Sequence, residues 1–187
     1  MATIISHSIA ALALGKAFAP NRPPLKFWLL TVTCSVLPDF DVISFVFGIR
    51  YSDMLGHRGI THSLLFALVV GALVGSLFFD EIDALSRKWW LLASYFFVAT
   101  ASHAVLDAMT DGGLGVAFFA PFSNERYFSP WRPIEVSPIG LEPFLSERGL
   151  TVIVSEIKWV WIPSALVAAA ATLIRRLGIH RSHDSNS

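Results

Sequence analysis

The stretch WWLLASYFFVATASHAVLDAMTDGG, residues 89–113, decides the fold of this chain. Its apolar part, Trp89–Met109, reaches the length of about 20 residues that a helix needs to cross a bilayer. It contains one histidine and one carboxylate, His103 and Asp107, and Gly112 and Gly113 follow as a helix end. Because ionisable groups inside such a segment are costly, they mark a functional site by default. The stretch therefore predicts a membrane helix with a functional group near its end.

The spacing of the ionisable residues in this segment suggests a metal site. His103 and Asp107 are four residues apart, so both lie on one face of a helix, and Asp111 continues that stripe. An imidazole and a carboxylate at this spacing can bind one metal ion. A His–Asp hydrogen bond inside a helical bundle is the alternative, and this segment alone fits both.

The composition of the whole chain agrees with a membrane protein. Of its 187 residues, 54% are hydrophobic and 15% are charged, and the mean hydropathy is +0.59. A soluble domain carries about 25% charged residues. The 14 basic and 14 acidic residues balance, so no nucleic-acid-binding surface is indicated. The single cysteine, Cys34, excludes an intramolecular disulfide, and we expect it to be a small buried apolar residue.

Five apolar segments organise the chain. They are Thr3–Phe18, Leu25–Leu37, Ser63–Phe79, Trp89–Met109 and Val152–Leu173. Their content of Ala, Leu and Val over long spans is typical of helices. We therefore expect an all-α fold, a multi-pass transmembrane helical bundle with three to five spans. The polar connection over residues 111–151 is expected to form a long extramembrane loop. We expect one membrane-embedded domain over residues 1–174 and a polar tail over residues 175–187.

A second cluster lies at the start of the third apolar segment. GHRGITHS, residues 56–63, contains His57 and His62, and Thr61 suits the N-cap of the helix that follows. His62 would then lie in the first helical turn, where the helix dipole favours the neutral imidazole that can bind a metal. Two structural loop histidines are the alternative.

A third cluster, LPDFD at residues 37–41, ends the second apolar segment. A proline ends the helix there, and Asp39 and Asp41 follow it. A pair of carboxylates can bind or bridge metal ions through oxygen. Ordinary turn chemistry is the alternative for this piece.

The clusters fall at one end of the bundle when the segments are traced back and forth across a bilayer. The candidate ligands at that end are His7, Asp39, Asp41, His57, His62, His103, Asp107, Asp111 and Glu156. The other end receives Lys16, Arg22, Lys26, Arg87, Lys88, Arg175, Arg176 and Arg181. An excess of Lys and Arg marks the cytoplasmic side. We therefore predict a cytoplasmic C-terminus and a metal site that faces the periplasm.

With these motifs together, the chain resembles the YdjM family of bacterial inner-membrane proteins, described as metal-dependent hydrolases. The resemblance rests on His7, PDFD at 38–41, HRGITHS at 57–63, SHAVLDAMTDGG at 102–113 and PFSNERYFSPWRPIE at 121–135. It implies a location in the inner membrane and a metal-dependent hydrolytic activity.

The order of the candidate ligands is also similar to that of zinc-dependent phospholipases C and single-strand zinc nucleases. Those enzymes have an early His, a middle Asp, another His and then H-x-x-x-D, which His103-Ala-Val-Leu-Asp107 matches. They add two histidines and a late carboxylate, for which this chain offers only Asp111 and Glu156. The similarity implies zinc as the divalent ion, with one or two ions bound.

The expected function is hydrolysis by a metal-activated water. The primary ligands in this hypothesis are His57, His62, His103 and Asp107, with Asp39 or Asp41 as a bridge and His7 as a further ligand.

Two arginines bear on the substrate. Arg58 and Arg132 are expected to stabilise an anionic group by forked hydrogen bonds, which favours a phosphoester. The position at the bilayer face favours a lipid-linked substrate, with membrane lipids as partners. The alternative is a non-enzymatic transporter or scaffold with a structural metal site. A transporter places its ionisable groups near the membrane midplane. In this chain the ionisable groups gather at one end, which favours the enzyme.

Overall fold

Helices make up nearly all of the regular structure. The computed structural model describes residues 1–19 and 23–184, and within these residues there is no β-strand, only two isolated bridges between loop residues. The α-helices are α1 (Ile4–Phe18), α2 (Leu25–Val36), α3 (Leu64–Leu77), α4 (Arg87–Ala108), α5 (Leu141–Phe144), α6 (Glu147–Glu156) and α7 (Ile162–Asp184). The expected all-α fold is confirmed.

A 3-10 helix carries the second apolar segment past Pro38. The chain passes from α2 into the 3-10 helix η1 (Leu37–Phe47), so Asp39 and Asp41 lie on a helical segment and not in the turn that was the alternative for this piece. Proline is tolerated at the first positions of a helical segment, where its missing N–H has no partner in any case. The α-helix thus ends before this proline, as expected, and what the sequence did not predict is the 3-10 helix that follows it.

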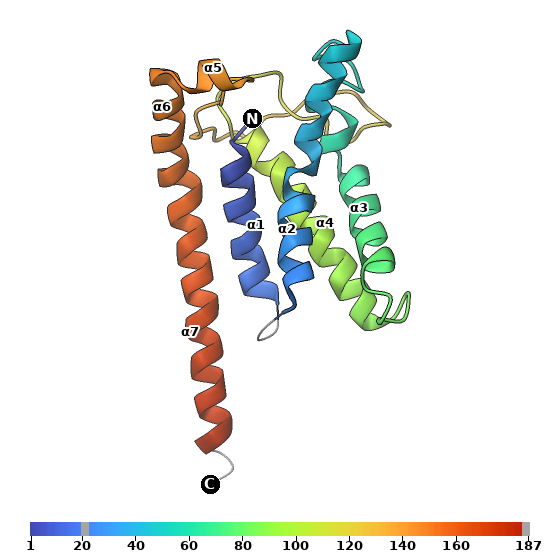
Figure 1. Cartoon of the computed structure of the whole chain (residues 1–187), viewed down its shortest axis with the longest axis vertical. Coiled ribbons are helices and arrows are strands. Elements are labelled where there is room, and N and C mark those ends of the chain that lie inside the picture. Colours follow the sequence, from blue (N-terminus) through green and yellow to red (C-terminus); the bar gives the residue numbers. More distant parts are fainter. Residues whose placement is uncertain (20–22, 185–187) are drawn as a thin grey trace.

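Three continuous helical segments are long and apolar enough to cross a membrane. They are Leu25–Phe47, Arg87–Ala108 and Glu147–Leu177. The apolar helices α1 and α3 have only 15 and 14 residues and lie beside the longer ones (Figure 1).

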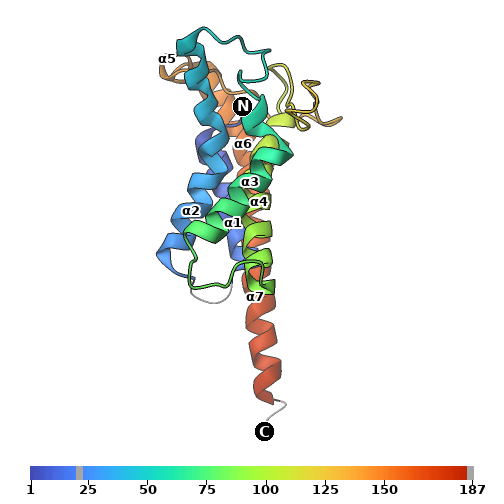
Figure 2. The same ribbon diagram turned by 90° about the vertical axis from the view of Figure 1, so that its right-hand side faces the viewer.

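Successive helices run in alternating directions (Figures 1 and 2). The start of α1, the end of η1, the start of α3, the end of α4 and the start of α6 lie at one end, as the sequence predicted; we call it the site end. At the other end, α7 extends beyond the bundle (Figure 1). It remains helical to Asp184, so most of the expected tail is helix. Arg22 and residues 185–187 lie outside the described residues.

The apolar core fills the bundle away from the site end. Its buried members include Phe27, Cys34, Val70, Val74, Tyr95, Phe96 and Ala99. Gly71 allows α3 to approach α4 closely, because a Cβ there would lie 2.5 Å from the carbonyl oxygen of Ala93. Cys34 is a buried member of this core, as expected.

The connection between α4 and α6 packs over the site end. Backbone hydrogen bonds join it to the bundle, from Ser129 N to Ala108 O and from Ala117 N to Arg58 O. It contains α5, and α6 begins at Glu147, five residues before the expected apolar segment. The connection therefore ends earlier than its sequence suggested, and it is held against the helices.

The tryptophans lie in two groups, one toward each end of the bundle. Trp28, Trp89 and Trp90 belong to the first turns of α2 and α4, whereas Trp131, Trp159 and Trp161 belong to the site end. Tryptophan is enriched where a membrane protein passes through the bilayer interface. The two groups have the separation expected if each end of the bundle lies near a bilayer interface.

Candidate metal centre

Four side chains from three helical segments converge at the site end. Asp39 comes from η1, His62 from the 3-10 turn η2 (Ile60–His62), and His103 and Asp107 from α4. Each offers one ligand atom, and these four atoms lie within 4.8 Å of one another. His103 Nε2 is 3.1 Å from His62 Nε2 and 3.2 Å from Asp39 Oδ1. We call these four residues the central cluster.

His7 approaches the central cluster from the first turns of α1. Its Nε2 lies 3.4 Å from Asp107 Oδ1, and its ring stacks on that of His103 with centroids 3.6 Å apart. Within the described residues, both ring nitrogens of His7 and both carboxylate oxygens of Asp39 are buried without a hydrogen-bond partner. Buried polar atoms without a partner are rare in proteins. These nitrogen and oxygen atoms fit the donor set of a divalent metal ion.

The charges around the central cluster favour a bound cation. Asp39, Asp41 and Asp107 are all buried there, and Arg58 is the buried basic residue beside them. Burial alone lowers the pKa of His62, but Asp107 and Asp41 outweigh it and raise that pKa to about 9. These carboxylates therefore favour positive charge at His62, whereas the helix dipole favours the neutral imidazole. A metal cation would be stabilised by the same buried carboxylates.

Contacts at the Nδ1 atoms turn two imidazoles toward the centre. His103 Nδ1 donates to the carbonyl oxygen of Ser35 at 2.7 Å, and His62 Nδ1 lies 3.1 Å from Asp41 Oδ2. Contacts of this kind fix the ring orientation of a metal-binding histidine. They leave the Nε2 atoms of His62 and His103 facing each other within the central cluster.

Asp41 is the hub of a second group. Its carboxylate contacts His57 Nδ1 at 2.6 Å and accepts hydrogen bonds from Thr61 Oγ1 at 2.7 Å and Arg58 N at 3.0 Å. Asp41, His57 and His62 also offer ligand atoms within 4.8 Å of one another. The structure thus places His57, expected as a primary ligand, beside the central cluster and joined to it through Asp41.

Arg58 is completely buried, and the protein itself binds its guanidinium. Nε donates to Asp107 Oδ2 at 3.0 Å, Nη2 to Thr110 Oγ1 at 3.0 Å and Nη1 to Gly112 O at 3.1 Å. Its φ of 60° lies in the left-handed region, which is uncommon for residues other than glycine. Arg58 therefore holds Asp107 in place, a different part from the substrate-binding one that the sequence suggested.

Asp111 and Arg132 lie away from the central cluster. Because α4 ends at Ala108, Asp111 is no longer on its helical face; it is exposed and accepts a hydrogen bond from Val136 N at 2.8 Å. Arg132 is exposed, and its guanidinium lies 4.6 Å from the ring centroid of Phe128.

Glu156 is also outside the central cluster, although it is completely buried. Its carboxylate accepts hydrogen bonds from Thr3 N, Thr3 Oγ1 and Ser6 Oγ, all at the start of α1. In the structure Glu156 therefore binds the start of α1, whereas the sequence suggested that it is a metal ligand.

The groups that hold the candidate ligands could not be predicted from the sequence motifs. Thr61 is not the N-cap of α3, because Ser63 accepts the capping hydrogen bond from Phe66 N; Thr61 binds Asp41 instead. The carbonyl oxygen of Ser35 binds a histidine 68 residues further along the chain. A motif carries no signal for a backbone contact between such distant segments.

These features define a class: helical membrane proteins with a buried His/Asp cluster that can hold a metal ion at one end of the bundle. The chain belongs to the YdjM inner membrane protein family, whose model matches residues 1–179. It is 39% identical over 170 residues to the Escherichia coli (strain K12) inner membrane protein YbcI, covering 89% of this chain and 95% of that protein. No solved structure matches the chain. The resemblance seen in the sequence and the inner-membrane class are thereby confirmed.

Proposed function

We propose that this protein is a metal-dependent hydrolase of the inner membrane. The observation that carries the proposal is the convergence of the central cluster and His7, whose buried donor atoms, like those of Asp39, have no hydrogen-bond partner among the described residues. A mixed set of imidazole and carboxylate donors suits zinc. In this proposal one ion is held by the central cluster, and His7 is an adjoining donor.

The protein groups around such an ion would have separate tasks. A divalent ion would supply a Lewis acid that polarises the attacked bond and lowers the pKa of a water from 15.7 to about 7. Arg58 keeps Asp107 in position, and Asp41 keeps His62 in position. His57, whose Nδ1 contacts Asp41, is the imidazole that we assign to proton transfer with the substrate.

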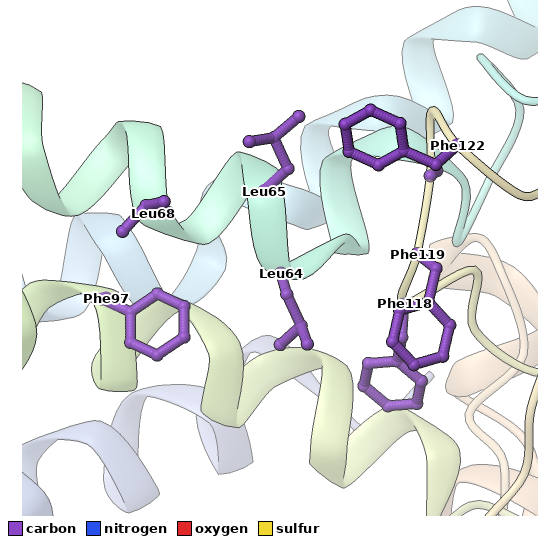
Figure 3. A pocket seen from close by; sticks show the side chains of 8 residues that line it. Leu64, Leu65, Leu68, Phe97, Phe118, Phe119 and Phe122 are labelled. Carbon is purple, nitrogen blue, oxygen red and sulfur yellow. The ribbon is translucent and has the colours of Figure 1, made fainter.

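The proposed substrate is a lipid-linked phosphoester. An apolar groove of about 350 Å³ runs between α3, α4 and the long connection, and Figure 3 shows Leu64, Leu68 and Phe97 lining it. It begins at Leu64, two residues after His62. In the bilayer such a groove suits an acyl chain while the headgroup stays at the interface. Arg132, exposed on the same connection, is the proposed contact for a headgroup phosphate.

The proposed orientation puts the central cluster on the periplasmic face and the C-terminus in the cytoplasm. Its support is the concentration of Lys and Arg at the end away from the site, which marks the cytoplasmic side of bacterial membrane proteins. Membrane lipids are then the proposed partners on the outer side.

Phosphoester hydrolysis by detergent-purified protein tests the proposal. The probes are bis(4-nitrophenyl) phosphate and a short-chain diacyl phospholipid. We expect a chelator to abolish hydrolysis, zinc or manganese to restore it, and Asp107→Asn to remove it. Glu142→Gln, an exposed carboxylate on α5, is the control and should leave the rate unchanged. If metal-loaded protein hydrolyses neither probe, the assignment as a phosphoesterase is wrong.

A second candidate, a scaffold with a structural metal, is favoured by burial. Each side chain of the central cluster is at most 5% exposed. A structural ion has only protein ligands and no open position. Under both candidate functions, the melting temperature should fall when metal is removed. Only a hydrolase should also lose turnover under conditions in which the metal-free chain remains folded.

A further inference from the structure

Glu156 is a buried carboxylate that needs partners, since burying a charge is costly unless it is well hydrogen-bonded. It is completely buried, and within the described residues no ion pair includes it. Its hydrogen bonds come from Thr3 N, Thr3 Oγ1 and Ser6 Oγ, the last at 2.6 Å. These groups lie at the N-terminus of α1, where the backbone N–H groups lack helical partners and the dipole favours an anion. Glu156 therefore binds the start of α1 across the bundle.

A π-helical turn brings a second side chain to the same contact. The segment η3 (Ile157–Trp161) is π-helical and directly follows Glu156. In an α-helix, residues five apart point about 140° away from each other. The wider π-turn brings such residues closer to one face. Trp161 Nε1 accordingly donates to Ser6 Oγ at 2.7 Å, so that both Glu156 and Trp161 bind Ser6.

His7 directly follows Ser6 in the first turns of α1. Neither of its ring nitrogens has a hydrogen-bond partner within the described residues. Its contacts within the site are the stacking on His103 and the approach to Asp107. Among the described residues no hydrogen bond therefore holds the ring, whereas the side chain of the preceding Ser6 is bound by both Glu156 and Trp161.

We propose that Glu156 is a positioning residue of the metal centre. By binding Thr3 and Ser6 it fixes the first turn of α1 and thereby directs His7 at Asp107. The inference rests on the proposed metal-binding function, and it replaces the role of Glu156 as a ligand. It also explains why a π-turn interrupts α6 and α7 at this level of the bundle.

A double-mutant cycle measures whether Glu156 acts through His7. Zinc affinity is measured for wild type, Glu156→Ala, His7→Ala and the double variant in detergent. We expect Glu156→Ala to lower the affinity 10–100-fold, the range for groups that orient a ligand. The same change should have less than a twofold effect when His7 is already absent. Glu147→Ala, an exposed carboxylate on α6, is the matched control and should have no effect.

Two results of the cycle would overturn the inference. One is an unchanged affinity in Glu156→Ala. The other is a loss that persists in full without His7, which would mean that Glu156 acts on the centre by another route.

A metal-free measurement separates this inference from the proposed function. Diethyl pyrocarbonate labelling of the apoprotein, read out by mass spectrometry, reports the accessibility of each histidine. In the wild type His7 is 1% exposed and should be protected. In Glu156→Gln, the milder variant, His7 should react at least several-fold faster while His103 stays protected. Equal rates in both proteins, or faster labelling of every histidine, would contradict the positioning role even in a chain that binds no metal.

Discussion

Arg58 donates from Nε to Oδ2 of Asp107 at 3.0 Å, and both side chains are completely buried. The same carboxylate oxygen lies 3.5 Å from His62 Nε2. Asp107 is thus shared between a buried cation and the imidazoles of the central cluster. Because the pair is inaccessible to water, loss of either partner leaves a charge that the surroundings cannot solvate.

This geometry predicts a large stability effect for Arg58→Gln. Breaking a buried ion pair by removing one partner costs about 3–5 kcal/mol. Thermal unfolding in detergent, followed by circular dichroism, measures it. The control is Arg50→Gln, which removes an exposed pair with Asp53 and should leave the melting temperature unchanged. Similar small effects of the two variants would show that Arg58 does not stabilise the cluster.

His103 and Asp107 are expected to be required for metal binding. Elemental analysis of gently purified wild type should find about one divalent transition metal per chain, whereas His103→Ala and Asp107→Asn should lose it. Removing a ligand should lower the metal affinity by more than the 10–100-fold that is typical for removing a group that only orients a ligand. His180→Ala, toward the C-terminal end of α7, should retain the metal. Equal losses in His180→Ala would separate metal binding from the central cluster.

His57 distinguishes the sequence-based ligand set from the observed geometry. Because His57 reaches the central cluster through Asp41, His57→Ala should weaken zinc binding no more than 10–100-fold. A primary ligand would instead lose binding almost completely. Isothermal titration of His57→Ala beside His62→Ala compares the two directly, and indistinguishable losses would return His57 to the ligand set.

The orientation in the membrane is testable by cysteine labelling. After Cys34→Ser, Glu125→Cys places a thiol on the long connection and Ala84→Cys places one in the turn between α3 and α4; both positions are exposed. A membrane-impermeant maleimide applied to intact cells, with the outer membrane permeabilised, should label position 125 and spare position 84. The reverse pattern would put the central cluster on the cytoplasmic side.

The parts of the site that follow from helical periodicity could be predicted from the sequence. His103 and Asp107 share one face of α4, and alternating helix directions bring His7, Asp39 and His62 to the same end. Both the shared face of α4 and the common end of the bundle follow from the rise and the turn of a helix.

The remaining residues depend on events that the sequence pattern does not report. Asp111 leaves the stripe because α4 ends at Ala108, and Asp39 stays helical because a 3-10 segment continues past Pro38. Glu156 and Arg58 have the expected charge for a site, but their partners lie up to 153 residues away. The roles of Glu156 and Arg58 are therefore determined by buried contacts between segments that are distant in the sequence.

The shortness of α1 and α3 has a consequence for the surrounding lipid. With 15 and 14 residues, each helix is only about 20 Å long, against a hydrocarbon core of about 30 Å. Such hydrophobic mismatch is relieved when the adjacent bilayer thins. Beside α3, thinning would lower the headgroups of the nearest lipids toward the depth of His62. For the lipid-linked substrate proposed above, thinning would bring the ester region to the level of the central cluster without extraction of the lipid from the bilayer.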